Sequence, residues 1–164
     1  MSAVYAESTS VSSEKSRAEI ERTLARYGAD QFAYGWNGDQ AMIGFRMHDR
    51  QVRLVLTLPD RNDDEFQRTP ARRNRRTPEQ SAAAWEQACR QRWRALALVI
   101  KAKLEAVAAG ISEFEDEFLA HTVLPDGSTA GQWMRPQIAA AYVSGTMPAM
   151  LPALGTGSGA PDEQ

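Results

Sequence analysis

Positively charged side chains gather in one stretch of this chain, and they are the residues whose types and spacing best suit a binding chemistry. Between Phe66 and Lys103, ten Lys or Arg stand against only two Glu, so this segment has a formal charge of +8. The whole 164-residue chain carries −2, so the remainder carries −10. Arginine outnumbers lysine eight to two in the segment, and its planar guanidinium suits paired contacts with phosphate oxygens and stacking on bases. A charge separation of this size favours a negatively charged binding partner for the basic segment, and it does not bear on the fold.

The candidate nucleic-acid-binding residues come from an arginine-rich connector, from one edge of the helix that follows it, and from two strands that precede it. They are Arg46, Arg53, Arg72, Arg73, Arg75, Arg76, Arg90, Arg94 and Lys101. Such residues would mainly contact the phosphate backbone, so binding should weaken as salt rises. Nothing in the pattern indicates readout of a base sequence. A solubilising or salt-bridged surface is the alternative interpretation of the same charges.

A second group of residues has the side chains that divalent metals prefer. Glu113, Glu117 and His121 recur at intervals of four, which would align them along one edge of a helix, and His48 could approach from a strand. A solvated acidic helix explains these residues equally, because the helix dipole favours negative charge in the first turn. We therefore expect neither a metal nor another cofactor.

Patterns typical of catalysis are missing from the sequence. It has no Gly-rich phosphate loop, no dinucleotide fingerprint and no paired-cysteine metal spacing. The single Cys89 cannot form an internal disulfide, and its place in a helix seam favours a small buried side chain over a nucleophile. We do not expect an enzyme.

The element that must position the basic residues is a long helix between Thr77 and Gly110. Thr77 and Gln80 form a capping-box pattern, Pro78 suits the first helical position, and Gly110 is typical of a helix stop. Spacings of three and four place one apolar seam along the helix: Trp85, Cys89, Trp93, Leu96, Ile100, Leu104 and Val107. The cationic candidates of this helix lie on a separate edge.

Strict alternation of apolar and polar residues predicts an antiparallel meander ahead of the long helix. We expect three strands, at residues 32–36, 41–48 and 51–58. Asn37-Gly38 and Asp49-Arg50 predict the two tight turns that join them. One face of this sheet is apolar and should be covered by the first helix and by the seam of the long helix. The opposite face is expected to show Arg46, His48, Arg53 and Thr57.

The predicted fold class is α+β: a helix, a three-stranded antiparallel meander, a long helix, then two short C-terminal helices. The first helix begins at Ser12 or Ser13 and runs to Tyr27. The short helices follow Ser112 and Thr129, and the second is expected to be interrupted near Pro136.

The expected domain organisation is a disordered N-terminus at 1–12, a single domain at 13–145 with a flexible basic connector at 60–76, and a disordered tail at 146–164. The two halves of the connector, one acidic and one basic, could pair with each other. No apolar run reaches the length of a membrane span, and the N-terminus has no apolar signal core. We therefore expect a cytoplasmic protein with no membrane partner.

Several runs of the sequence resemble an uncharacterised family that recurs in bacteriophage and prophage genomes. The resemblance is clearest in residues 20–29, in 92–107 and in 118–127, and it extends over most of the chain. It implies a phage accessory role in DNA metabolism or host interaction, in the cytoplasm of a bacterial host. The order helix, three strands, long helix over residues 13–110 is also similar to double-stranded RNA-binding domains and to the core of phage single-strand annealing proteins.

Two functional hypotheses follow from these observations. The first is a nucleic-acid-binding phage accessory protein that contacts the backbone of DNA, rather than RNA, through the arginine-rich connector and helix edge. The alternative is a protein-interaction or assembly subunit, a homo-oligomer or a host-factor binder, without nucleic-acid binding. Its support is the long seam helix and the apolar C-terminal helix.

Overall fold

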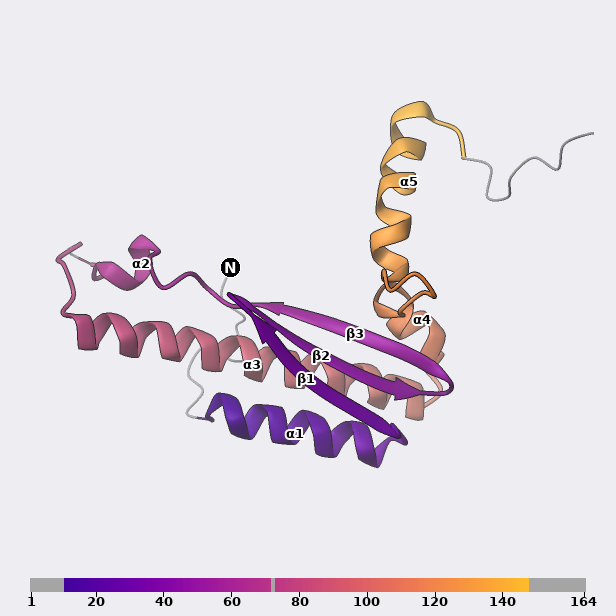
Figure 1. Cartoon of the computed structure of the whole chain (residues 1–164), viewed down its shortest axis with the longest axis horizontal. Coiled ribbons are helices and arrows are strands. Elements are labelled where there is room, and N and C mark those ends of the chain that lie inside the picture. Colours follow the sequence, from indigo (N-terminus) through magenta and orange to yellow (C-terminus); the bar gives the residue numbers. More distant parts are fainter. Residues whose placement is uncertain (1–10, 72, 148–164) are drawn as a thin grey trace, which may run out of the picture.

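The computed structural model describes residues 11–71 and 73–147, and its elements follow the expected order (Figure 1). They are α1 (Ser13–Arg26), β1 (Gln31–Asn37), β2 (Gln40–Met47), β3 (Arg50–Thr57), α2 (Asp64–Gln67), α3 (Pro78–Ala108), α4 (Phe114–Phe118), the 3-10 turn η1 (Leu119–His121) and α5 (Ala130–Ser144). The predicted α+β class is confirmed. The termini predicted to be disordered lie outside the described residues, apart from 11, 12, 146 and 147, and so does Arg72.

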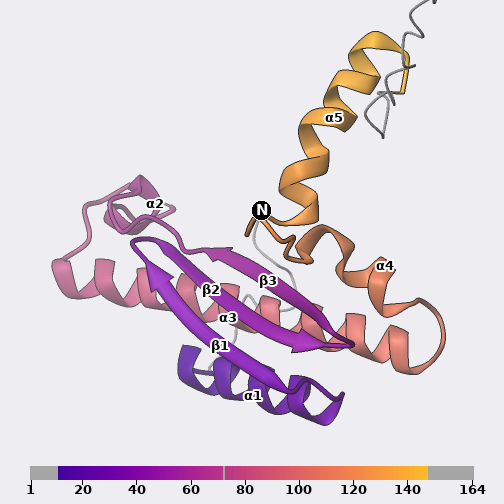
Figure 2. The same ribbon diagram turned by 45° about the vertical axis from the view of Figure 1, so that its right-hand side comes forward.

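The three strands form an antiparallel sheet in the order β1-β2-β3, and α1 and α3 lie on one face of it (Figures 1 and 2). The register aligns Phe32, Phe45 and Val52 across the sheet. Side chains alternate between faces along a strand, so this row faces the helices and its neighbours face away. The expected covering of the apolar face by two helices is confirmed.

Both turns of the meander lie one residue away from their predicted positions. Asn37 pairs with Gln40, so Gly38 and Asp39 form the first turn, and Gly38 supplies the positive φ (59°) that a type II′ turn needs. In the second turn, His48 (φ 50°) and Asp49 (φ 57°) both adopt the left-handed conformation of a type I′ turn. His48 therefore sits in a turn, not on the outer face of the sheet as predicted.

The core lies between the sheet and the two helices that cover it. It is built from Ile20, Leu24, Ala41, Ile43, Phe45, Met47, Val52, Leu54, Trp93, Ala97, Ile100, Leu104, Phe114 and Phe118. The predicted capping box of Thr77 and Gln80 is present at the start of α3. The predicted seam supplies the buried Cys89, and Leu96 and Val107 are partly buried against the core.

The connector between β3 and α3 has more regular structure than its composition suggests. The four-residue α2 buries Phe66, and residues 68 and 75 pair across a short return. The indole N–H of Trp85 donates to the Pro59 carbonyl at 2.8 Å, and the Arg61 guanidinium lies 3.9 Å from the centre of the Trp85 ring. These contacts hold the start of the connector against α3.

The C-terminal part crosses back to β3 before α5 begins. Backbone pairing joins Val52 to Thr122, and the Val123 N–H donates to the Gln51 carbonyl at 2.7 Å. α5 then rises away from the rest of the molecule (Figures 1 and 2). The predicted interruption at Pro136 is wrong, because α5 continues through it.

Pro136 leaves α5 short of one backbone donor, and the helix tolerates the loss. The proline itself is exposed, so water can reach the carbonyl that it leaves without a partner. The side-chain amide of Gln137 donates to the Trp133 carbonyl at 3.0 Å, which satisfies a neighbouring acceptor.

Candidate interaction surfaces

Two of the predicted binding residues, Arg46 and Arg53, do lie on the outer face of the sheet, and each has an acceptor within the chain. The Nε of Arg46 donates to Oδ1 of Asp30 at 2.9 Å, and this hydrogen-bonded guanidinium holds the pKa of the Asp30 carboxyl below its usual value. The Nη2 of Arg53 donates to the Gly127 carbonyl at 2.8 Å. These two arginines therefore attach the sheet to a loop and to the C-terminal part.

The described arginines of the connector pair with its acidic half, as the charge pattern allowed. Arg73 Nη2 lies 2.9 Å from Oδ2 of Asp64, and Arg76 donates to the Glu65 carbonyl at 3.2 Å. The guanidinium of Arg75 is exposed, and no partner for it appears within the described residues.

The cationic edge of α3 lies on the helical layer, on the other side of the core from Arg46 and Arg53. Arg94 pairs with Glu19 of α1, and Arg90 donates to the side-chain carbonyl of Gln87 at 2.6 Å. Lys101 is exposed and has no acceptor among the residues that the structure describes.

The predicted binding residues therefore occupy three separate places: the outer face of the sheet, the connector and the helical layer. Of the described members of the set, only Arg75 and Lys101 have a side chain with no hydrogen-bond or ion-pair partner within the part of the chain that is described. Positive charge that is divided among three surfaces and mostly paired produces a weaker field than one continuous patch.

Two residues of the candidate metal constellation, Glu117 and His48, contact other side chains, and Glu113 lies just before the first turn of α4. Glu117 is hydrogen-bonded to the ammonium of Lys103 at 2.9 Å, which lowers the pKa of its carboxyl. His48 stacks on Phe114 with ring centroids 5.1 Å apart, and burial lowers the pKa of His121. Across residues 11–71 and 73–147, no three His, Cys, Asp or Glu side chains come close enough to hold a metal ion.

Exposed apolar residues gather on α5. The helix has a single charged residue, Arg135, and its only buried residue is Gly131 at the base. Tyr142 is 87% exposed and Val143 is 91% exposed, while Trp133 and Ile138 are each about half exposed. A solvated helix normally shows charged residues on its free side, so α5 is unusual in exposing apolar side chains within the described part of the chain.

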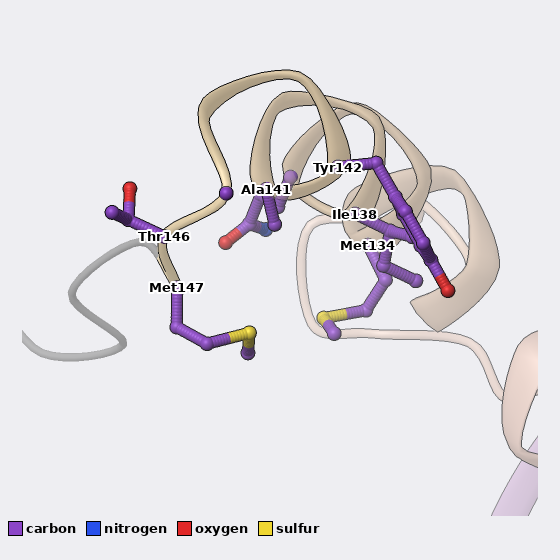
Figure 3. A pocket seen from close by; sticks show the side chains of 8 residues that line it. Met134, Ile138, Ala141, Tyr142, Thr146 and Met147 are labelled. Atoms are coloured by element: carbon purple, nitrogen blue, oxygen red, sulfur yellow. The ribbon is translucent and has the colours of Figure 1, made fainter.

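The far end of α5 carries an open groove. The left-handed Gly145 (φ 67°) turns the chain so that Met147 faces back toward Met134 across a space of about 460 Å³ (Figure 3). The lining is almost wholly apolar and includes Ile138 and Tyr142. The predicted site residues include none of these side chains, although the sequence shows a single charged residue, Arg135, over residues 130–144.

Comparison with protein-family models, with curated proteins and with solved structures found no match for this chain. Among the described residues, no helix combines the length and the apolar character that crossing a membrane requires.

Proposed function

We propose that this protein is an assembly subunit that forms a homo-oligomer through α5. The observation that carries the proposal is the exposed apolar surface of that helix, with Trp133, Ile138, Tyr142 and Val143 presented to solvent on an element with one charge. Burying such side chains contributes about 1.5–3 kcal/mol for each aliphatic residue, so a partner surface has a large gain available.

The test is the mass of the protein in solution. The chain has a mass of 18.1 kDa, so light scattering across a dilution series distinguishes a monomer from a multiple of that value. We expect the unaltered protein to exceed the monomer mass, and the double variant Ile138→Asp with Tyr142→Asp to fall to it. The matched control is Val99→Asp, because Val99 is an equally exposed apolar residue on α3. A monomeric unaltered protein at tens of micromolar would overturn the proposal.

Binding of nucleic acid is the second candidate function, and the connector supports it. Arg68, Arg73, Arg75 and Arg76 lie within nine residues of one another, and the Arg73 side chain is 72% exposed despite its pairing with Asp64. Exposed ion pairs contribute little, so a phosphate could replace the carboxylate. Fluorescence anisotropy with labelled single-stranded and duplex DNA tests this function. Affinity that falls steeply with salt supports it, and absence of binding at low salt rejects it.

A further inference from the structure

The base of α5 is packed against the rest of the chain. A Cβ placed on Gly131 would lie 2.7 Å from the Ala120 carbonyl oxygen, so the first turn of the helix packs directly on the backbone of η1. Arg53 holds the preceding loop through the Gly127 carbonyl. α5 points away from the sheet in both views (Figures 1 and 2), and within residues 11–71 and 73–147 no other element covers its apolar side chains.

The outer face of the sheet is a second surface that the described part of the chain leaves uncovered. α1 and α3 occupy the opposite face, and no described helix lies on this one (Figure 2). Small residues of neighbouring strands, Ala33, Gly35 and Gly44, line a shallow depression of about 850 Å³. The exposed apolar side chains of Met42 and Val55 project from the same face. We refer to these five residues as the sheet trough.

The two glycines of the trough are not required by the packing of the chain itself. A Cβ on Gly35 would meet no atom within 4 Å, and one on Gly44 would meet nothing closer than 3.9 Å. Neither residue has a positive φ. Glycine within a strand weakens it, and often marks a place where another backbone or a ligand approaches closely. Here the space above both glycines is open.

We infer that α5 of one copy lies in the sheet trough of a second copy, and that the second copy returns the contact, so that two chains form a symmetric dimer. This inference depends on the proposed assembly function. The dimensions agree, because the 15 residues of α5 span about 22 Å and strands of seven or eight residues span roughly 23–27 Å. Bulky side chains on the helix and small ones in the trough are complementary in shape.

The buried area is sufficient for a stable dimer. Met134, Ile138, Ala141 and Tyr142 share one side of α5, and their exposed side chains offer on the order of 300 Å² per helix. Two helices against two troughs then bury on the order of 1,200 Å², which is the lower end of the range for specific interfaces. In a two-fold symmetric dimer, both α5 helices and both troughs are buried. The assembly is therefore closed, and neither surface remains free to add a third copy.

The charges of both surfaces favour a second copy over a charged partner. α5 carries only Arg135, and the five trough residues carry no charge. The neighbouring Arg46 and Arg53 already have acceptors in Asp30 and Gly127. A helix with one charge and a trough whose neighbouring charges, Asp30 and Arg53, already have partners are therefore matched to each other.

Cysteine cross-linking between two differently tagged chains tests the arrangement. One chain carries Val55→Cys in the trough and the other carries Ile138→Cys in α5, while the native Cys89 is buried in both. After the chains are mixed and oxidised, we expect a disulfide-linked heterodimer, identified by mass spectrometry of the joined peptides. The matched control replaces Val55→Cys by Val99→Cys on the opposite side of the molecule, and it should not cross-link.

A second variant separates failure of this inference from failure of the proposed function. Gly35→Val fills the trough without meeting any atom of its own chain, so the variant should keep its circular dichroism spectrum and become monomeric. A dimer that persists in Gly35→Val and gives no cross-link overturns the inference but leaves assembly through α5 intact. An unaltered protein that is monomeric overturns both.

Discussion

At the scale of single residues, the sequence identified which side chains could bind an anion. It did not show which of them are already paired with a carboxylate of the same chain. Arg94 finds its carboxylate in Glu19, 75 positions away, and Arg46 finds Asp30, 16 positions away. Spacing along the chain carries no information about such pairs, because the packing of α1 on α3 and the register of the sheet create them. Only the pairing inside the connector, between Asp64 and Arg73, was foreseeable as an acidic half next to a basic half.

The ion pair of Lys103 and Glu117 predicts a pH dependence of stability. The Lys103 ammonium lowers the pKa of Glu117 from its ordinary value of 4.5. The folded state then binds the proton less readily than the unfolded state, so the contribution is complete above about pH 4.5 and is lost as the pH falls through the lower folded-state pKa. In Glu117→Gln, we expect the free energy of unfolding to fall less steeply over this acid range.

Urea unfolding of both proteins at a series of pH values from 6 to 3 measures this difference. Glu115→Gln, which changes an exposed carboxylate of the same helix, is the matched control and should follow the unaltered protein. Parallel pH profiles for Glu117→Gln and the unaltered protein would contradict the assignment.

At the scale of elements, alternation and capping patterns located the strands and the long helix almost to the residue. The turns moved by one position because the positive-φ residues, Gly38 in one turn and His48 with Asp49 in the other, are chosen by the pairing register. Pro136 was expected to break α5, and the helix instead continues through it with the loss of one backbone hydrogen bond. The positions of the turns and the continuity of α5 depend on strand pairing and on solvent exposure, which the local sequence does not determine.

The contact of Gly131 with Ala120 predicts a specific cost for adding one methyl group. In Gly131→Ala, the new Cβ would lie 2.7 Å from a backbone oxygen, so either α5 shifts or the 3-10 turn deforms. We expect a loss of about 1–3 kcal/mol in the free energy of unfolding, as for other overpacked contacts. Hydrogen exchange should show faster exchange at the base of α5. The control is Gly35→Ala in the monomeric background of Ile138→Asp with Tyr142→Asp, where it should leave stability nearly unchanged.

The seam of α3 predicts a difference between two neighbouring aliphatic residues. Leu104 is 1% exposed and lies in the core, whereas Val99 is exposed on the same helix. Leu104→Ala should destabilise the fold by about 2–5 kcal/mol, because it removes buried methyl groups and leaves a cavity. Val99→Ala should change stability by less than about 0.5 kcal/mol. Chemical denaturation of both variants measures the contrast, and equal effects would contradict the packing described here.

At the scale of the whole molecule, the direction of α5 and the division of the cations among three surfaces were beyond the reach of the sequence. Composition gave the +8 segment, but the fold places part of it on the helical layer and part in the connector, and the sheet arginines lie across the core. Apolar periodicity in residues 130–144 indicated a helix that should pack against something. The chain itself supplies no partner for it within the described residues.

Self-association predicts that thermal stability depends on protein concentration. A partner that binds only the folded state raises the melting temperature by mass action, so the unaltered protein should melt at a higher temperature at 100 μM than at 1 μM. The variant Ile138→Asp with Tyr142→Asp should melt at the same temperature at both concentrations. Scanning calorimetry or fluorimetry over that range measures the shift. A melting temperature of the unaltered protein that does not vary with concentration would contradict self-association.

Cys89 is a native probe of local unfolding around the first half of α3. The thiol is 6% exposed beside Trp93, and burial raises its pKa to about 11. Only the thiolate reacts readily with alkylating reagents, so at neutral pH the native side chain is almost inert. Alkylation of Cys89 therefore requires a local opening that separates the first half of α3 from the elements packed against it. The rate of modification by a maleimide therefore counts these excursions directly, with no engineered probe, and slows whenever a ligand or partner holds the helix in place.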